Sequence, residues 1–124
     1  MSDFLTTFMD DLKTNVSGFI AVSVTEIKTG MSYCSLSMDP SFDPELASAY
    51  NLEVIKAKFA AIKALNLKQK IDDILITLTT QLHIIDISDN EQYFVYLAVD
   101  SSKANLGMTR AILKKYSKDI ASRL

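Results

Sequence analysis

The chain has 124 residues and a hydrophobic content of 48%, which suffices for a single core, so residues 1–124 are predicted to form one domain. The formal charge is −2 and the only arginines are Arg110 and Arg123, which argues against nucleic acid as a partner because its recognition relies on bidentate arginine contacts. A single cysteine, Cys34, excludes an internal disulfide framework and indicates a reducing compartment.

The apolar segments and the distribution of lysines indicate where the protein is located and which partners it can bind. The N-terminus has no basic region ahead of an apolar stretch, and no segment approaches the roughly 18 uninterrupted apolar residues of a membrane helix. We therefore expect a cytoplasmic protein without membrane insertion. Lysines gather between Lys56 and Lys70, but acidic residues stand nearby, so a solvated helix face is the simplest interpretation.

A first helix is predicted over about residues 2–15. Apolar side chains recur there at spacings of three and four, which places them along one side of a helix: Phe4, Leu5, Phe8, Met9 and Leu12. Ser2 or Asp3 is suited to cap its start.

A β-hairpin and a long helix are predicted next. Residues 19–27 and 31–38 are rich in strand-forming residues, and Gly30 between them suits a turn. Asp43 is a good N-cap, and Pro44 at the first helical position loses no hydrogen bond, because the amide there would have no partner in the helix. This middle helix is predicted to run from Pro44 to about residue 66.

Three strands and a final helix complete the chain. The strand-like runs cover residues 72–79, 82–88 and 92–99, and the short links between them favour antiparallel neighbours. The final helix is predicted over about residues 103–123. Because several strands are apolar on both faces, we expect a sheet between two helix layers, an α/β (α+β) domain of order α-β-β-α-β-β-β-α.

The middle helix carries two apolar stripes on nearly opposite sides. One consists of Leu46, Tyr50, Val54, Ala57, Ala61 and Leu65, and the other of Leu52, Ile55, Phe59 and Ile62. One stripe can cover the sheet, and exposing the second would leave side chains whose burial is worth roughly 1.5 to 3 kcal/mol each. A second surface must therefore cover one of them.

The preferred hypothesis is an isologous homodimer in which two middle helices pack through Leu52, Ile55, Phe59 and Ile62. The alternative is that the N-terminal helix or the loop through Phe42 covers this helix within one protomer. A second interface is possible along residues 72–79, whose alternating pattern suits edge-to-edge pairing through Leu75 and Thr77. Asp72 and Asp73 at the start of that run are equally consistent with gatekeepers that prevent such pairing.

Catalytic and cofactor-binding patterns are missing from the sequence. The only histidine, His83, has no ligand or base at suitable spacing, since Asp86 would face the other side of the strand. The three glycines are too scattered for a phosphate-binding loop. We predict no catalytic residue, no metal and no cofactor, and structural roles for His83 and Cys34.

Gly107 and Arg110 of the final helix are both interpreted as structural residues. Gly107 is costly inside a helix, and either allows close packing on the sheet or is a tolerated surface residue. Arg110 is a candidate to pair with a carboxylate or a carbonyl at a strand end, and we favour this over a role as a GTPase-activating arginine finger.

The chain resembles the roadblock/LC7 domain over nearly its whole length. The resemblance rests on the first helix leading into Gly18-Phe-Ile-Ala-Val22, the hairpin with Gly30, the order of elements, and the ending Val99-Asp100 followed by Ala104-Asn-Leu-Gly-Met-Thr-Arg110. It implies a five-stranded antiparallel sheet with the middle helix on one face and both terminal helices on the other. Dimers of that family join their sheets edge to edge and pair their middle helices.

The function that this resemblance implies is non-catalytic. We expect a homodimeric adaptor or regulator that binds a Ras-like small GTPase. A GTPase-activating protein for such a GTPase and a purely structural scaffold subunit are the alternatives. No functional signature in the loop 39–43 or the turn 28–29 transfers from the family, so no activity is assigned to single residues.

Overall fold

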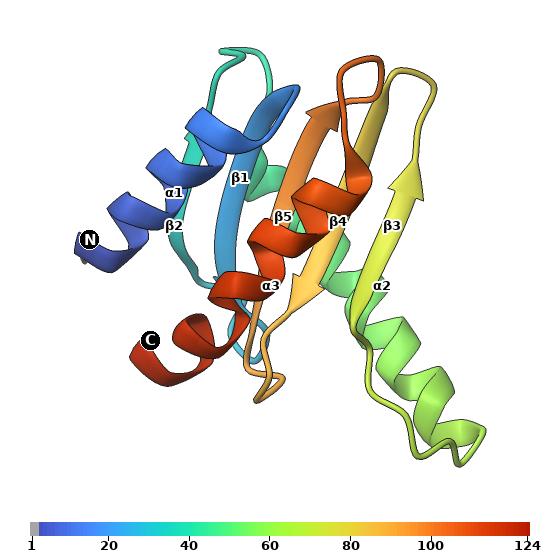
Figure 1. Ribbon diagram of the computed structural model, residues 1–124. Helices are drawn as coiled ribbons and strands as arrows, with labels where there is room; N and C mark the ends of the chain where they lie inside the picture. Colours follow the sequence, from blue (N-terminus) through green and yellow to red (C-terminus); the bar gives the residue numbers. More distant parts are fainter. Residues whose placement is uncertain (1–2) are drawn as a thin grey trace.

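The computed structural model describes residues 3–124, in which eight elements follow the predicted order. They are α1 (Asp3–Asn15), β1 (Phe19–Glu26), β2 (Ser32–Ser37), α2 (Pro44–Ala64), β3 (Asp73–Thr77), β4 (Gln81–Ile87), β5 (Tyr93–Asp100) and α3 (Leu106–Arg123). The predicted cap Ser2 lies outside the described residues. Figure 1 shows the three helices packed on the sheet.

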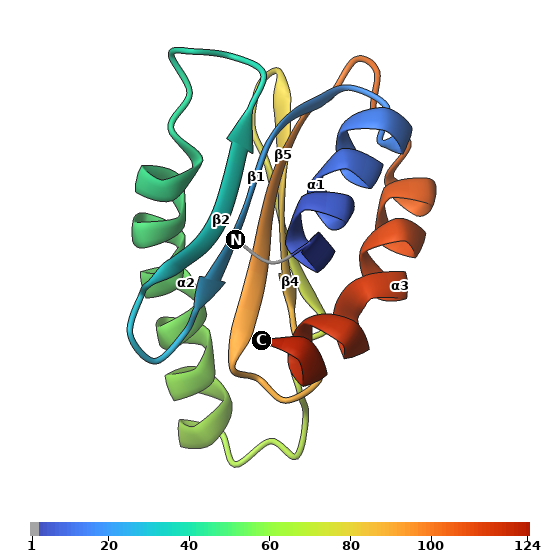
Figure 2. The same ribbon diagram turned by 90° about the vertical axis from the view of Figure 1, so that its left-hand side faces the viewer.

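The five strands form one antiparallel sheet in the order β2-β1-β5-β4-β3. Helix α2 covers one face of the sheet, and α1 and α3 lie side by side on the other (Figure 2). The predicted fold class and layer arrangement are therefore confirmed. Strands β2 and β3 form the two edges, so each has only one neighbouring strand.

Local signals fix the ends of the helices and the hairpin turn. Asp43 caps α2 as predicted, because its carboxylate accepts hydrogen bonds from the amides of Glu45 and Leu46 at 3.0 and 3.1 Å. The predicted turn residue Gly30 has a φ of +74°, which glycine adopts without strain. Helix α3 begins at Leu106, later than predicted, because the side chain of Asn105 accepts a hydrogen bond from the Met108 amide and caps it.

The predicted ambiguity at Gly107 is also resolved. It is the second residue of α3 and is exposed, and a Cβ added there would lie 3.8 Å from the nearest atom, Asn105 Oδ1. Gly107 therefore has no close-packing role, and the interpretation as a tolerated surface residue is correct.

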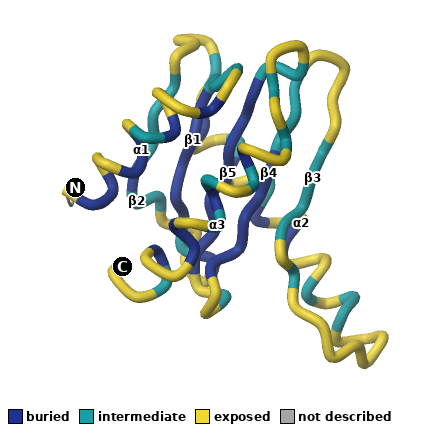
Figure 3. The backbone as a smooth tube through the Cα atoms, viewed as in Figure 1, coloured by how far each residue is buried: buried dark blue, intermediate teal, exposed yellow. Residues whose placement is uncertain are grey.

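Both faces of the sheet carry an apolar core. Under α1 and α3 lies the larger cluster, in which Phe8, Leu12 and Leu97 are fully buried. Under α2 lies a smaller cluster around Ile55, Phe94 and Tyr96. The central strands are accordingly almost wholly buried, whereas the C-terminal half of α2 is mostly exposed (Figure 3).

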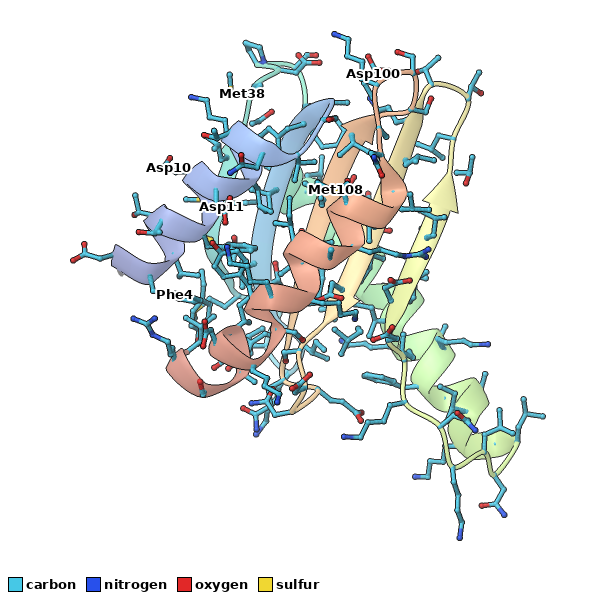
Figure 4. The ribbon with its side chains drawn as sticks, in the orientation of Figure 1. Phe4, Asp10, Asp11, Met38, Asp100 and Met108 are labelled. Atoms are coloured by element: carbon cyan, nitrogen blue, oxygen red, sulfur yellow. The ribbon has the colours of Figure 1, made fainter. Side chains whose placement is uncertain are left out.

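Helices α1 and α3 are joined by a polar contact as well as by apolar packing. The Tyr116 hydroxyl donates a hydrogen bond to the Asp11 carboxylate, and the Tyr116 ring packs edge-on against Phe8 with 4.8 Å between ring centroids. Figure 4 shows Asp11 on the side of α1 that faces α3. This hydrogen bond is the main reason that the pKa of Asp11 is lowered from its ordinary value.

The Tyr116→Phe variant is expected to lose about 1 to 2 kcal/mol of stability at neutral pH, because it loses a hydrogen bond to a charged acceptor. A lowered folded-state pKa stabilises the protein above the ordinary carboxyl pKa and loses this effect as the pH falls through the folded value. The stability difference from the parent protein should therefore shrink at acid pH. Urea unfolding at several pH values measures it, and a difference that is the same at every pH would contradict the assignment.

The control for this variant is Thr7→Val. Thr7 lies on α1 and is exposed, so the loss of its hydroxyl should leave stability nearly unchanged at every pH.

Candidate functional site

Helix α2 packs on the sheet through a side of large residues. Leu52 and Ile55 are 6% and 0% exposed, and Phe59 is partly buried against the same cluster. Near the start of the helix, Ser48 lies on this side too and shares a hydrogen bond with Ser23 of β1. These contacts fix the rotation of α2 about its axis.

The prediction that Leu52 and Ile55 form the dimer interface is therefore wrong. Leu52 and Ile55 contact the sheet of their own protomer, so their side chains are unavailable to a second copy. The physical reason is that isoleucine, leucine and phenylalanine bury more apolar area than Ala57 and Ala61 of the other stripe. No signal in the sequence settles this choice, because Ser48 on the stripe of Leu52 and Ile55 is polar and its partner Ser23 lies 25 positions away.

The opposite stripe of α2 is left in solvent. Its large side chains are exposed by 57% at Leu46, 73% at Tyr50, 39% at Val54 and 66% at Leu65. Ala57 is also exposed, and Ala61 is half-buried. We call these six residues the outer stripe. A contiguous apolar row of this length on a helix is unusual for the free surface of a monomer.

A groove lies between α2 and the start of β3. It has a volume of about 450 Å³, and its apolar lining comes from Val54, Ile62, Leu67, Ile71 and Ile74. Of the four α2 residues predicted for the interface, Ile62 thus faces an open groove, beside Val54 of the outer stripe.

Strand β3 forms the free edge nearest to this groove. Leu75, predicted for the edge interface, packs against the core under α1 and α3 and is half-buried, whereas Thr77 is exposed. Leu78, just beyond the strand, is 44% exposed. The paired strand ends at Thr77 and is shorter than the predicted run 72–79, and its outer backbone has no partner strand in the sheet.

Charged side chains of α3 hold β3 in place. The Arg110 guanidinium makes two hydrogen bonds to the Asp73 carboxylate, 2.9 Å from Nε and 3.0 Å from Nη2. Lys114 Nζ lies 2.5 Å from Asp72 Oδ1 and 2.8 Å from Asp86 Oδ1. The predicted carboxylate pairing of Arg110 is confirmed. The two acids at the start of β3 are therefore engaged by α3.

Asp86 is the buried member of this network, with its side chain 2% exposed. Burial raises the pKa of Asp86, while the hydrogen bond from Lys114 opposes that rise. Without Lys114 the carboxylate would remain buried and unpaired at neutral pH, which is costly. Lys114 is thus a structural residue of the β3 edge.

The Lys114→Met variant is expected to lose about 2 to 3 kcal/mol of stability at neutral pH, since it leaves Asp86 without its cation. The loss should narrow as the pH falls and Asp86 takes up a proton, because a raised folded-state pKa destabilises the fold only above the ordinary carboxyl pKa, and fully above the folded-state value. Urea unfolding across the acid range measures this. Lys115→Met is the control, because Lys115 is 67% exposed and its ion pair with Asp11 is superficial; equal losses in both variants would refute the proposed role.

Catalytic chemistry has no evident place among the described residues. His83 is half-buried, its Nε2 hydrogen-bonds with Gln81 and its Nδ1 with the Tyr96 hydroxyl, and burial lowers its pKa. Burial likewise raises the pKa of Cys34 to about 11, which suits a packed thiol. Within residues 3–124, no three His, Cys, Asp or Glu side chains are grouped to hold a metal.

None of the helices in the described part of the chain is long and apolar enough to cross a membrane.

Comparison with protein-family models found no match to this chain, and comparison with curated protein sequences found none either. Solved structures do match it. A roadblock/LC7 domain from Streptomyces avermitilis aligns with a TM-score of 0.80 and 9% identity over 94% of this chain and 94% of its own. The gliding protein MglB from Thermus thermophilus aligns with a TM-score of 0.77 and 17% identity over 97% of this chain and 89% of its own.

A third structure, described as MglB with a tetrameric arrangement, aligns with a TM-score of 0.78 and 15% identity over 98% of this chain and 90% of its own. At these identities the matches establish the fold. The chain has the roadblock/LC7 fold over almost its full length, as the sequence resemblance predicted.

Proposed function

We propose that this roadblock/LC7-fold chain is a non-catalytic homodimeric adaptor or regulator whose partner is a Ras-like small GTPase. The observation that carries the proposal is the outer stripe of α2, which leaves Leu46, Tyr50 and Leu65 in solvent. Regulators of this kind work by presenting a surface, which agrees with a chain whose histidine and cysteine are both taken up by packing. We place its action in the cytoplasm.

The charges beside the outer stripe favour a second copy in antiparallel orientation. At helical spacing Glu53 and Lys56 fall on one flank of the stripe, on either side of Val54. A two-fold axis near Val54 brings Glu53 of one protomer close to Lys56 of its partner. Opposite charges then meet near the middle of the interface, and a parallel pair would lack this match.

The free edge of β3 gives the same dimer a second contact. Of the six predicted interface residues, Thr77 on that edge and Ile62 in the neighbouring groove stay in the proposed interface. Phe59 and Leu75 leave it with Leu52 and Ile55, because both pack against a core of their own protomer. The predicted alternative role of Asp72 and Asp73 as gatekeepers loses support, because both carboxylates pair with α3. The tetrameric arrangement of the structurally similar MglB is also consistent with self-association in this fold.

The GTPase partner is proposed from the roadblock/LC7 resemblance, and affinity purification from the native cell identifies it. GTP turnover by the captured GTPase, measured with and without this protein, then separates the possible roles. Binding with unchanged turnover supports an adaptor, and faster turnover supports a GTPase-activating protein. If no GTPase is captured, the proposal fails in favour of a structural scaffold subunit.

A further inference from the structure

The C-terminal end of α2 and the connection after it form a basic projection. Residues 54–71 contain five lysines and no aspartate or glutamate, in a chain whose formal charge is −2: Lys56, Lys58, Lys63, Lys68 and Lys70. This part of the chain extends beyond the end of the sheet (Figure 1), and most of it is exposed (Figure 3). The structure therefore concentrates positive charge at one protruding end.

The acids that follow these lysines in sequence do not neutralise them. Asp72 pairs with Lys114, and Asp73 with Arg110, so both carboxylates already have partners on α3. Lys70 lies 3.8 Å from Glu91, but its side chain is 72% exposed and this ion pair is weak in water. Lys56 pairs with Glu53 at 3.9 Å in the same exposed and weak manner. Within residues 3–124, Lys63 and Lys68 make no ion pair, so the positive charge of this projection is available to attract an external anionic surface.

Two leucines occupy the apex of the projection. Leu65 is the C-cap of α2, Asn66 has a left-handed φ of +55°, and the chain reverses direction there. Leu65 and Leu67 on either side of this reversal are 66% and 48% exposed. Lysines stand next to them on both sides in the segment Lys63-Ala-Leu-Asn-Leu-Lys-Gln-Lys70, which we call the basic tip.

We propose that the basic tip binds the surface of an anionic lipid membrane. Each lysine near such a surface strengthens binding by about fivefold, and the long lysine side chains can reach the headgroups while the leucines enter the apolar boundary below them. This is adsorption at the interface, distinct from membrane insertion of a helix. Adsorption at such a surface accounts for both the apolar apex and the lysines around it.

Nucleic acid and an acidic protein fit the tip less well. The tip has no arginine for bidentate contacts to phosphate and no aromatic ring on which a base can stack. An acidic protein surface would attract the lysines, but it offers no apolar layer for two leucines that project from a narrow apex. A lipid surface provides both kinds of contact at once.

Cosedimentation with lipid vesicles tests this inference. The full chain is expected to bind vesicles of phosphatidylcholine mixed with phosphatidylglycerol and to stay in solution with phosphatidylcholine alone. Substituting glutamine at Lys63, Lys68 and Lys70 together should weaken binding to the mixed vesicles by about a hundredfold. The matched control carries glutamine at Lys13, Lys103 and Lys118, which changes the net charge equally at exposed sites away from the tip and should bind like the parent chain.

A second variant tests the apolar part of the tip. Leu67→Ser is expected to weaken vesicle binding by about tenfold while the chain still unfolds cooperatively at only a slightly lower temperature, since Leu67 is half in solvent. The inference is overturned if the parent chain ignores the anionic vesicles, if both triple variants lose binding equally, or if heparin binds the tip and vesicles do not. Leu65 belongs to both the outer stripe and the tip, so the variants that test the membrane contact are placed at the lysines and at Leu67. A monomeric Tyr50→Asp variant retains these residues and should still bind vesicles.

Discussion

Replacing Ile55 by aspartate is expected to unfold the protein. Ile55 is fully buried between α2 and the sheet, beside Phe94 and Tyr96. The substitution removes most of an apolar side chain from a packed core and places an unpaired carboxylate there, at a combined cost of at least about 4 kcal/mol. Small domains have about 5 to 15 kcal/mol of stability in total, so most of the folded population is lost.

Circular dichroism and urea unfolding measure this effect. The matched control is Ala60→Asp, which introduces the same charge at an exposed position of the same helix and should leave the fold intact. A folded and stable Ile55→Asp variant would show that α2 does not pack on the sheet through this side. The pair of variants therefore tests the rotation of α2 directly.

Replacing Tyr50 by aspartate is expected to convert a dimer into a folded monomer. Tyr50 is the most exposed large residue of the outer stripe, at 73%, so its loss leaves the core of the protomer untouched. In an isologous interface each substitution acts twice, and an aromatic anchor is worth about 2 kcal/mol or more at each copy. The dimer should weaken by about a thousandfold.

Light scattering on a size-exclusion column determines the oligomeric state, and thermal unfolding confirms that the variant is folded. Ala49→Asp is the control, because Ala49 is exposed and immediately adjacent but lies outside the outer stripe. If the parent chain is itself a monomer at micromolar concentration, the homodimer proposal is refuted. If the Tyr50→Asp variant remains a dimer, another surface joins the protomers.

Local sequence signals determine those features whose residues are close together in the chain. The order of the elements, the cap at Asp43 and the turn at Gly30 are all confirmed, because each depends on residues within a few positions of one another. The end of β3 was placed too late, at residue 79. Thr79 and Leu78 have a strand-like composition, but pairing with β4 ends at Thr77 opposite Leu82.

The sequence by itself determined that α2 has two apolar stripes and that one of them needs a second surface. It could not determine which stripe faces the sheet, because helical periodicity is the same for both and the choice depends on contacts with distant residues such as Phe94. The pairings of Lys114 with Asp86 and of Arg110 with Asp73 join residues 28 and 37 positions apart. Only the tertiary structure brings such groups together. It thereby decided which side of α2 is core, which side is left in solvent, and that Asp72 and Asp73 pair with α3 beside the basic tip.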